Sequence, residues 1–170
     1  MTNQTFFKGA PVKLAGQFVK VGMKAPDFSL VTGELTRFTL ANGKGKRLLL
    51  NIFPSIDTAV CSLSVRKFNE FAAGLNQTLV LCISKDLPFA QSRFCGAEGL
   101  KNVITLSDFH CDSTFGEDYG VRMRDGILSG LLARAVVIID LDGTVSYAKL
   151  SPDLTEEPDY EGALKVLGAR

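Results

Sequence analysis

The sequence predicts an α/β protein with a central mixed β-sheet flanked by helices. From residue 48 onward, short apolar segments alternate with longer segments whose apolar residues recur at every third or fourth position. Apolar strands that alternate with helices usually pair in parallel and have both faces covered. Near the C-terminus, two apolar segments joined through Asp142-Gly143 predict an antiparallel hairpin. Parallel and antiparallel pairing are therefore both expected in one sheet.

The chain before this alternation is expected to form short strands. They are predicted at residues 5–8, 12–14, 28–31 and 35–40. The first two flank Gly9-Ala10-Pro11 and predict a small hairpin within residues 1–20, as an N-terminal extension of the main sheet. The basic segment 43–47 predicts a solvated turn, because it lacks the glycine spacing and the final Lys-Ser or Lys-Thr of a phosphate-binding loop.

The alternating region is predicted to contain three strands, two helices, a hairpin and a closing helix. The strands are expected at residues 48–53, 78–84 and 103–106, the helices at 62–75 and 89–95, the hairpin at 135–140 and 144–148, and the last helix at 160–167. This order resembles the thioredoxin fold with a longer N-terminus. Open α/β sheets place their ligands at the carboxyl ends of the strands. The strand 48–53 ends at Pro54, so a functional site is expected there.

Length and charge restrict the kinds of protein to consider. The 170 residues, 46% of them hydrophobic, suit one domain spanning residues 1–170. The net charge of +1 gives no reason to expect nucleic acid or an anionic membrane as a partner. The N-terminus has no basic segment followed by an apolar run, and no apolar run is long enough to span a bilayer. A cytoplasmic location is therefore expected.

The sequence contains four cysteines, namely Cys61, Cys82, Cys95 and Cys111. In a reducing compartment they are too few to form a disulfide scaffold. Cys82 lies within an apolar predicted strand and is expected to be a packing residue. Cys111 follows His110, the only histidine, in a polar segment that predicts a surface loop. A zinc site is not expected, because no two cysteines have the close spacing of zinc ligands.

Cys61 has the strongest local evidence for a reactive role. It follows a polar turn and stands at the start of the predicted helix 62–75, whose apolar residues form one stripe. Ser55, Asp57 and Thr58 are residue types that cap helices. Thiols in the first turn of a helix tend to react as thiolates, because the helix dipole favours an anion there. The Thr58 hydroxyl, one turn earlier, can bond to the sulfur or to its substrate.

Two other thiol chemistries do not fit this segment. The loop of a cysteine phosphatase resembles Cys-x5-Arg and is rich in glycine, whereas Arg66 stands one position too early and glycine is lacking. A dithiol oxidoreductase requires Cys-x-x-Cys at the helix start, and Ser64 occupies the second position. On residue types alone a packing role for Cys61 stays open, and for Cys95 packing and reactivity are equally supported.

The spacing Pro54-x-x-x-Thr58-x-x-Cys61 resembles the active-site motif of the peroxiredoxins, and residues 22–28 are similar to their N-terminal segment. Within that superfamily the chain is similar to the bacterial thiol peroxidase family from residue 5 to residue 167. The likeness is carried by residues 51–58, 65–68, 86–99, 132–135 and 157–160. Residues 62–63 differ from the small residues common after the cysteine. The loop around Cys111 is variable, so the likeness gives Cys111 no role.

This resemblance implies a thioredoxin-like fold and a peroxidase that reduces hydrogen peroxide and organic hydroperoxides. Cys61 would be the peroxidatic cysteine, and Cys95 the resolving cysteine that forms an intrachain Cys61–Cys95 disulfide with it. Thr58 would position the thiolate and the peroxide, Pro54 would shield the pocket, and Arg134 would place its guanidinium near the thiolate. Thioredoxin would reduce the disulfide, the protein would be a homodimer, and no metal, haem or flavin would be needed.

The predicted helices also limit how such a disulfide can form. Cys95 is expected two turns into its helix, which is roughly 10 Å along the axis, while Cys61 lies in another helix. A disulfide needs Cα atoms about 4.4–6.8 Å apart. We therefore expect both helix ends to unwind locally first, helped by Gly96 and Gly99. Two other functions stay open: a peroxide sensor that passes its disulfide to a partner, and a binding module with incidental cysteines.

Overall fold

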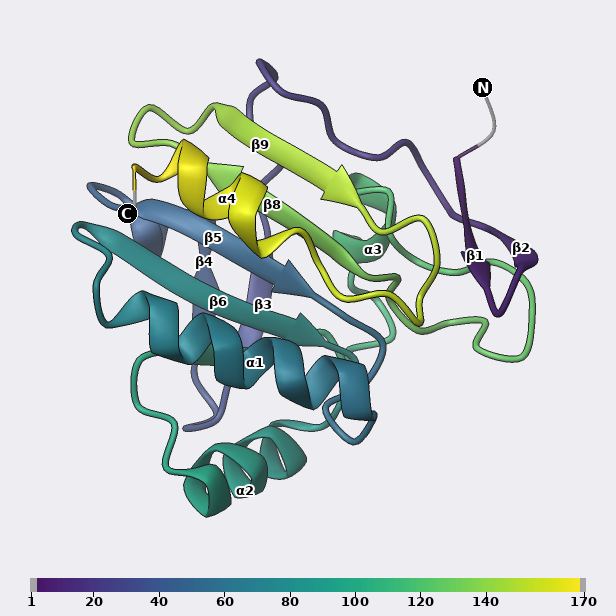
Figure 1. Ribbon diagram of the computed structural model, residues 1–170, viewed down its shortest axis with the longest axis horizontal. Helices are drawn as coiled ribbons and strands as arrows, with labels where there is room; N and C mark the ends of the chain where they lie inside the picture. The colour runs from purple at the N-terminus through teal and green to yellow at the C-terminus, as the bar shows by residue number, and fades with distance from the viewer. Residues whose placement is uncertain (1–2, 169–170) are drawn as a thin grey trace.

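Residues 3–168, which the computed structural model describes, form a seven-stranded mixed sheet with helices on both faces and a separate two-stranded sheet (Figure 1). The strands are β1 (Gln4–Phe7), β2 (Ala10–Lys13), β3 (Ser29–Thr32), β4 (Arg37–Thr39), β5 (Arg47–Ile52), β6 (Thr78–Ser84), β7 (Ile104–Ser107), β8 (Ala135–Ile139) and β9 (Val145–Leu150). The helices are α1 (Ala59–Ala72), α2 (Pro88–Glu98), α3 (Phe115–Asp118) and α4 (Tyr160–Val166), and the 3₁₀ turn η1 spans Leu40–Gly43. Residues 1–2 and 169–170 of the predicted domain 1–170 lie outside the described part.

The main sheet has the mixed pairing that the sequence predicts. Its strands are ordered β4-β3-β7-β6-β5-β8-β9. β5 is parallel to β6, and β6 is parallel to β7, whereas all other neighbours are antiparallel. The predicted C-terminal hairpin is β8–β9, and the predicted N-terminal hairpin is β1–β2. The α/β class, with a central mixed sheet and an N-terminal hairpin, is therefore confirmed.

Differences from the predicted boundaries lie mainly at helix ends. α1 begins at Ala59 rather than residue 62, because Thr58 is the last residue with extended backbone (φ −95°, ψ 148°). Cys61 is therefore inside the first turn of α1. α2 continues past Cys95 to Glu98, and the next residue, Gly99, caps it in a left-handed conformation with φ 66°. The sequence pattern does not predict α3, which has only 4 residues and therefore shows no periodicity.

Side chains of the central strands alternate between two apolar layers. Leu49 of β5 and Val136 of β8 face the layer that α1 and α4 cover (Figure 1). Leu48 and Leu50 face the opposite layer, which includes Phe115 of α3. Within residues 3–168, no helix has both the length and the apolar character needed to cross a membrane.

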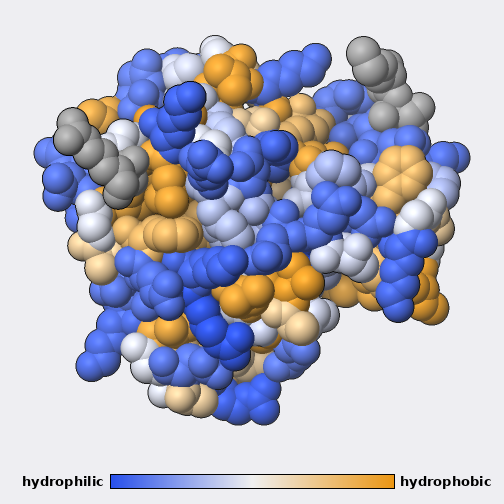
Figure 2. Space-filling model, in the orientation of Figure 1, coloured by the Kyte–Doolittle hydropathy of each residue, from blue (hydrophilic) through white to orange (hydrophobic). Residues whose placement is uncertain are grey.

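α1 is amphipathic and presents a buried stripe to the sheet. The buried residues of this helix are Cys61, Ser64, Val65 and Phe68, which recur at three- and four-residue steps. On the outer face, over the region of α1 and α2, hydrophilic residues surround smaller hydrophobic patches (Figure 2). The stripe therefore fixes which side of α1 meets the core and sends Cys61 inward.

Replacing Phe68 with alanine should lower the free energy of unfolding by about 3–5 kcal/mol. Phe68 is fully buried, and its ring lies 6.4 Å from that of Phe71 and 5.1 Å from that of Tyr160 in α4. Chemical denaturation of the reduced protein measures the change. Phe89→Ala is the matched control, because this phenylalanine is 64% exposed on α2. Equal losses of unfolding free energy in Phe68→Ala and Phe89→Ala would contradict the conclusion that Phe68 packs in the core.

Candidate active site

Cys61 lies beyond the carboxyl end of β5, inside the first turn of α1. After β5 the chain passes the buried Pro54 and turns before entering the helix. Cys61 is fully buried and belongs to the apolar cluster that contains Phe53, Ile56 and Val65. The sulfur therefore sits at the edge of the sheet where parallel α/β proteins bind their ligands, as the sequence predicts.

Asp86, in the turn after β6, holds the turn that precedes α1. Its carboxylate accepts hydrogen bonds from the Ser55 hydroxyl at 2.8 Å and from the Ile56 N–H at 2.7 Å. Ser84 also donates to this carboxylate at 2.6 Å, and Gln91 of α2 donates to the Ser84 hydroxyl at 3.0 Å. Asp86 therefore connects the turn before α1 with the start of α2. Sequence reasoning assigns it no role, because a lone aspartate in a turn is a common solvated residue.

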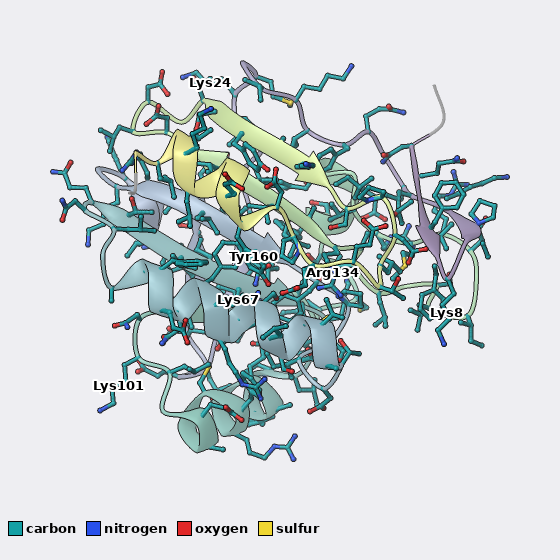
Figure 3. The ribbon with its side chains drawn as sticks, viewed as in Figure 1. Lys8, Lys24, Lys67, Lys101, Arg134 and Tyr160 are labelled. Carbon is teal, nitrogen blue, oxygen red and sulfur yellow. The ribbon has the colours of Figure 1, made fainter. Side chains whose placement is uncertain are left out.

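Arg134, immediately before β8, is labelled in Figure 3. Its guanidinium is directed to Cys61. Antiparallel pairing of Ile52 with Ala135 aligns the start of β8 with the end of β5, which brings these distant parts of the chain together. Nη2 of Arg134 donates to the Cys61 sulfur at 3.3 Å. Nη2 and Nε also donate to the Leu154 carbonyl, at 2.9 and 3.1 Å. The predicted neighbours Arg134 and Cys61 thus meet in the core.

The guanidinium of Arg134 is buried and forms no direct ion pair within residues 3–168. The carboxylate that its charge influences is Glu157, whose pKa is lowered mainly by its hydrogen bond with Lys67 and to a smaller extent by the charge of Arg134. Arg134 is 2% exposed. Its Nη1 is also buried and has no acceptor in that part of the chain. A buried cation without a directly paired charge is unfavourable. A thiolate at Cys61 would supply this charge, and Nη1 offers a further donor to a molecule bound beside the sulfur.

Thr58 closes the start of α1, and its hydroxyl is engaged away from the sulfur. The hydroxyl donates to the Ser55 carbonyl at 3.0 Å, and the Thr58 carbonyl accepts the N–H of Ser62 at 2.9 Å. Thr58 is exposed, whereas Pro54 is buried. A bond from the Thr58 hydroxyl to the Cys61 sulfur or to a peroxide would require it to leave Ser55. The positioning role of Thr58 therefore stays a prediction, as does the shielding role of Pro54.

Two buried polar residues support the Cys61 turn from inside the core. The Ser64 hydroxyl donates to the Cys61 carbonyl at 2.7 Å, and the Asn51 amide of β5 donates to Ser64 at 3.2 Å. The same amide donates to the sulfur of Cys82 at 3.8 Å. Burial raises the pKa of Cys82 to about 12, although the Asn51 hydrogen bond opposes this effect. The Cys82 thiol therefore stays protonated at neutral pH, which agrees with a packing role.

Cys95 and its neighbour Phe94 face different parts of the molecule. Phe94 packs against Arg66 of α1, and the distance from the guanidinium carbon of Arg66 to the centroid of the Phe94 ring is 5.6 Å. Cys95 instead lines a hollow between α2, β7 and the β3–β4 turn. Burial raises the pKa of the Cys95 thiol, and a hydrogen bond with Thr105 partly opposes this. Cys61 and Cys95 are free thiols within intact helices. The expectation that both helix ends unwind locally before a disulfide forms stays a prediction.

The fourth cysteine, Cys111, is exposed in the loop after β7. The ring of its neighbour His110 stacks on Phe109, with centroids 4.3 Å apart, and its Nε2 lies 3.2 Å from the guanidinium of Arg37. Within residues 3–168, no three His, Cys, Asp or Glu side chains are gathered so that they could hold a metal ion. The segment is a surface loop, in agreement with the prediction.

Comparisons with known proteins identify the family of this chain. The Redoxin family model matches residues 20–164. A thiol peroxidase of Mycobacterium tuberculosis is 52% identical over 166 residues, which cover 98% of this chain and 99% of that protein. A thiol peroxidase of Corynebacterium glutamicum is 49% identical over 164 residues, covering 96% of this chain and 98% of that protein. The crystal structure of a peroxiredoxin-like protein from Aquifex aeolicus superimposes with a TM-score of 0.92 at 41% identity, covering 99% of this chain and 97% of that chain. The chain therefore belongs to the Redoxin family, among the thiol peroxidases of the peroxiredoxin superfamily.

Proposed function

We propose that this protein reduces hydrogen peroxide and organic hydroperoxides to water and alcohols in a cycle that uses Cys61 and Cys95. The observation that carries the proposal is the buried guanidinium of Arg134, whose Nη2 lies 3.3 Å from the Cys61 sulfur. Within residues 3–168 no carboxylate forms an ion pair with this cation. Such a site favours the thiolate, which is the nucleophilic form of cysteine.

In the first step the Cys61 thiolate attacks one peroxide oxygen. An S–O bond forms and the O–O bond breaks, so the distal oxygen leaves as hydroxide or alkoxide and takes a proton to become water or alcohol. Cys61 is oxidised to a sulfenic acid. Arg134 assists because Nη2 stabilises the thiolate and the free Nη1 can donate to the oxygen that gains charge. Thr58 would orient the peroxide once its hydroxyl leaves Ser55, and Pro54 would keep water from the sulfur.

In the second step the Cys95 thiol attacks the Cys61 sulfenic acid. The Cys61–Cys95 disulfide forms and water leaves. Because Cys95 faces the hollow beside β7, the helix α2 must open before the two sulfurs meet. Thiol–disulfide exchange with thioredoxin then returns both cysteines to thiols. This cycle suits a reducing compartment such as the cytoplasm, where it would contribute to antioxidant defence, and we propose a homodimer as the working form.

The Cys95→Ser variant should react once with peroxide and then stop. Its Cys61 is still oxidised, but the sulfenic acid has lost its resolving thiol, so thioredoxin-dependent turnover is lost. Stopped-flow mixing with limiting peroxide measures the first step, and a thioredoxin and thioredoxin reductase assay measures turnover. Peptide mass mapping of peroxide-treated wild-type protein should find the Cys61–Cys95 linkage.

The exposed Cys111 provides the matched control. Cys111→Ser should keep both the linkage and the full turnover. A disulfide between Cys61 and Cys111, or between two Cys61 residues, would overturn the assignment of Cys95. Slow recycling of a stable wild-type disulfide would instead favour a peroxide sensor, and an unreactive Cys61 would favour a binding module.

A further inference from the structure

The orientation of Arg134 depends on one short segment of backbone, residues 151–154. The Leu154 carbonyl accepts hydrogen bonds from both Nε and Nη2 of Arg134, at 3.1 and 2.9 Å. At the other end of the segment, the Ser151 N–H donates to the Arg134 carbonyl at 2.9 Å. The segment therefore holds Arg134 by its backbone and by its guanidinium. Nη2, the atom that contacts Cys61, is one of the two donors to Leu154.

The N-terminal hairpin in turn holds this segment. The Thr5 hydroxyl of β1 donates to the Ser151 carbonyl at 2.8 Å and approaches the Pro152 carbonyl at 3.2 Å. The Phe6 N–H donates to the Pro152 carbonyl at 3.0 Å, and the Phe6 carbonyl accepts the Leu154 N–H at 2.8 Å. β1 thus lies along residues 151–154 like an added strand, with a parallel bridge between Phe6 and Asp153.

Side chains strengthen the same contact. Thr5 is 1% exposed, so its hydroxyl bond to Ser151 is shielded from water. The Leu154 side chain is buried in a small cluster with Val12 and Leu14, which follow the hairpin turn, and with Met123. On the outer side, the Asp153 carboxylate accepts the N–H groups of the hairpin turn at Lys8 and Gly9, at 3.3 and 3.0 Å. These bonds help to lower the pKa of Asp153 to about 2, with the largest contribution from Thr155.

We propose that the hairpin β1–β2 is a positioning element for Arg134, and that Thr5 is its main positioning residue. A chain of contacts runs from Thr5 to the Ser151 carbonyl, along the backbone to Leu154, and from the Leu154 carbonyl to the guanidinium that faces Cys61. The hydrogen bonds of the Thr5 hydroxyl go to the carbonyls of Ser151 and Pro152, so Thr5 acts on the sulfur through this chain of contacts. Thr5 acts by holding the Leu154 carbonyl in place. That carbonyl then accepts from Nε and Nη2 of Arg134 while Nη2 faces the Cys61 sulfur. The inference rests on the proposed function, because it assigns Arg134 a role in the reaction with peroxide.

The hairpin has no other evident link to the reaction. It forms its own two-stranded sheet and pairs with no strand of the main sheet within residues 3–168. Its position beside the segment that follows β9 is visible in Figure 1. A stabilising extension could be attached anywhere on the surface, whereas this one bonds to the segment that carries the Leu154 carbonyl.

Thr5→Val tests this proposal, because valine keeps the shape of threonine and removes the hydroxyl. The second-order rate of the first oxidation of Cys61 should fall by about three- to tenfold, as expected when one buried hydrogen bond is lost. In an Arg134→Met background, Thr5→Val should cause no further fall. Thr5→Ser, which restores the hydroxyl, should recover most of the rate. The NMR signal of the Arg134 Nε–H should exchange faster with water in Thr5→Val than in the wild type.

Thr78→Val is the matched control, because the Thr78 hydroxyl also donates to a backbone carbonyl, that of Asn76, at 2.9 Å. It should leave both the oxidation rate and the Arg134 Nε–H signal unchanged. Equal rate losses from Thr5→Val with and without Arg134 would overturn the proposal, as would an unchanged Nε–H signal. A wild-type protein that does not react with peroxide at all would instead overturn the proposed function. These two failures are therefore distinguishable.

Discussion

Replacing Cys61 with serine is expected to abolish measurable reduction of peroxide. The reaction requires a thiolate, and a serine hydroxyl stays protonated at neutral pH and is a far weaker nucleophile toward an O–O bond. The fold should persist, because Arg134 keeps both of its bonds to the Leu154 carbonyl. Direct loss of peroxide from solution and thioredoxin-coupled turnover both measure the effect, and thermal unfolding checks that the variant is folded.

Cys82→Ala is the control that separates chemistry from burial. Like Cys61, Cys82 is fully buried, on the α1 side of the sheet. Because burial raises the pKa of Cys82 to about 12, its thiol is not expected to react, and the variant should reduce peroxide at the wild-type rate. Turnover by Cys61→Ser, or loss of turnover in folded Cys82→Ala, would contradict the assignment of Cys61 as the reacting thiol.

The position of Cys61 could be predicted from sequence because its causes are local. An apolar strand, a proline, helix-capping residue types and a helical stripe occur in order along residues 48–75. Together they place a thiol at a strand end and in a first helical turn. The end of α1 that carries Cys61 still differed from the prediction by a few residues, because the exact capping residue depends on the backbone of Thr58.

The partners of Cys61 could not be derived from local pattern, because they are far away in the sequence. Arg134 reaches the sulfur through the pairing of β5 with β8, and only the family resemblance pointed to it beforehand. The Leu154 carbonyl has no signal in residue type, since every residue has a carbonyl. The contribution of Asp86 likewise depends on the meeting of two turns that follow neighbouring parallel strands. Such groups become visible only when the register of the sheet is known.

Replacing Arg134 with methionine should slow the first oxidation of Cys61 by about 100- to 1,000-fold, the loss typical of removing a donor aimed at developing charge. Methionine fills much of the space but cannot donate to the sulfur or to the leaving oxygen. Arg134→Lys should lose less, because it keeps the charge. Lysine lacks the forked N–H groups with which the guanidinium bonds to both the Leu154 carbonyl and the Cys61 sulfur. The oxidation rate of Arg134→Lys should therefore stay below that of the wild type. Stopped-flow measurement with limiting peroxide gives the rate without interference from later steps.

The stability of these variants must be separated from their chemistry. Arg134→Met leaves the Leu154 carbonyl without its two donors, which should reduce the free energy of unfolding by about 1–3 kcal/mol. Arg122→Met is a suitable control, because this arginine pairs with Glu117 and stays partly exposed. It should leave the oxidation rate of Cys61 unchanged. Free guanidinium, below denaturing concentration, should restore part of the rate of Arg134→Met and none of that of Cys61→Ser. If folded Arg134→Met protein reacted at the wild-type rate, the guanidinium would not be required for the oxidation of Cys61.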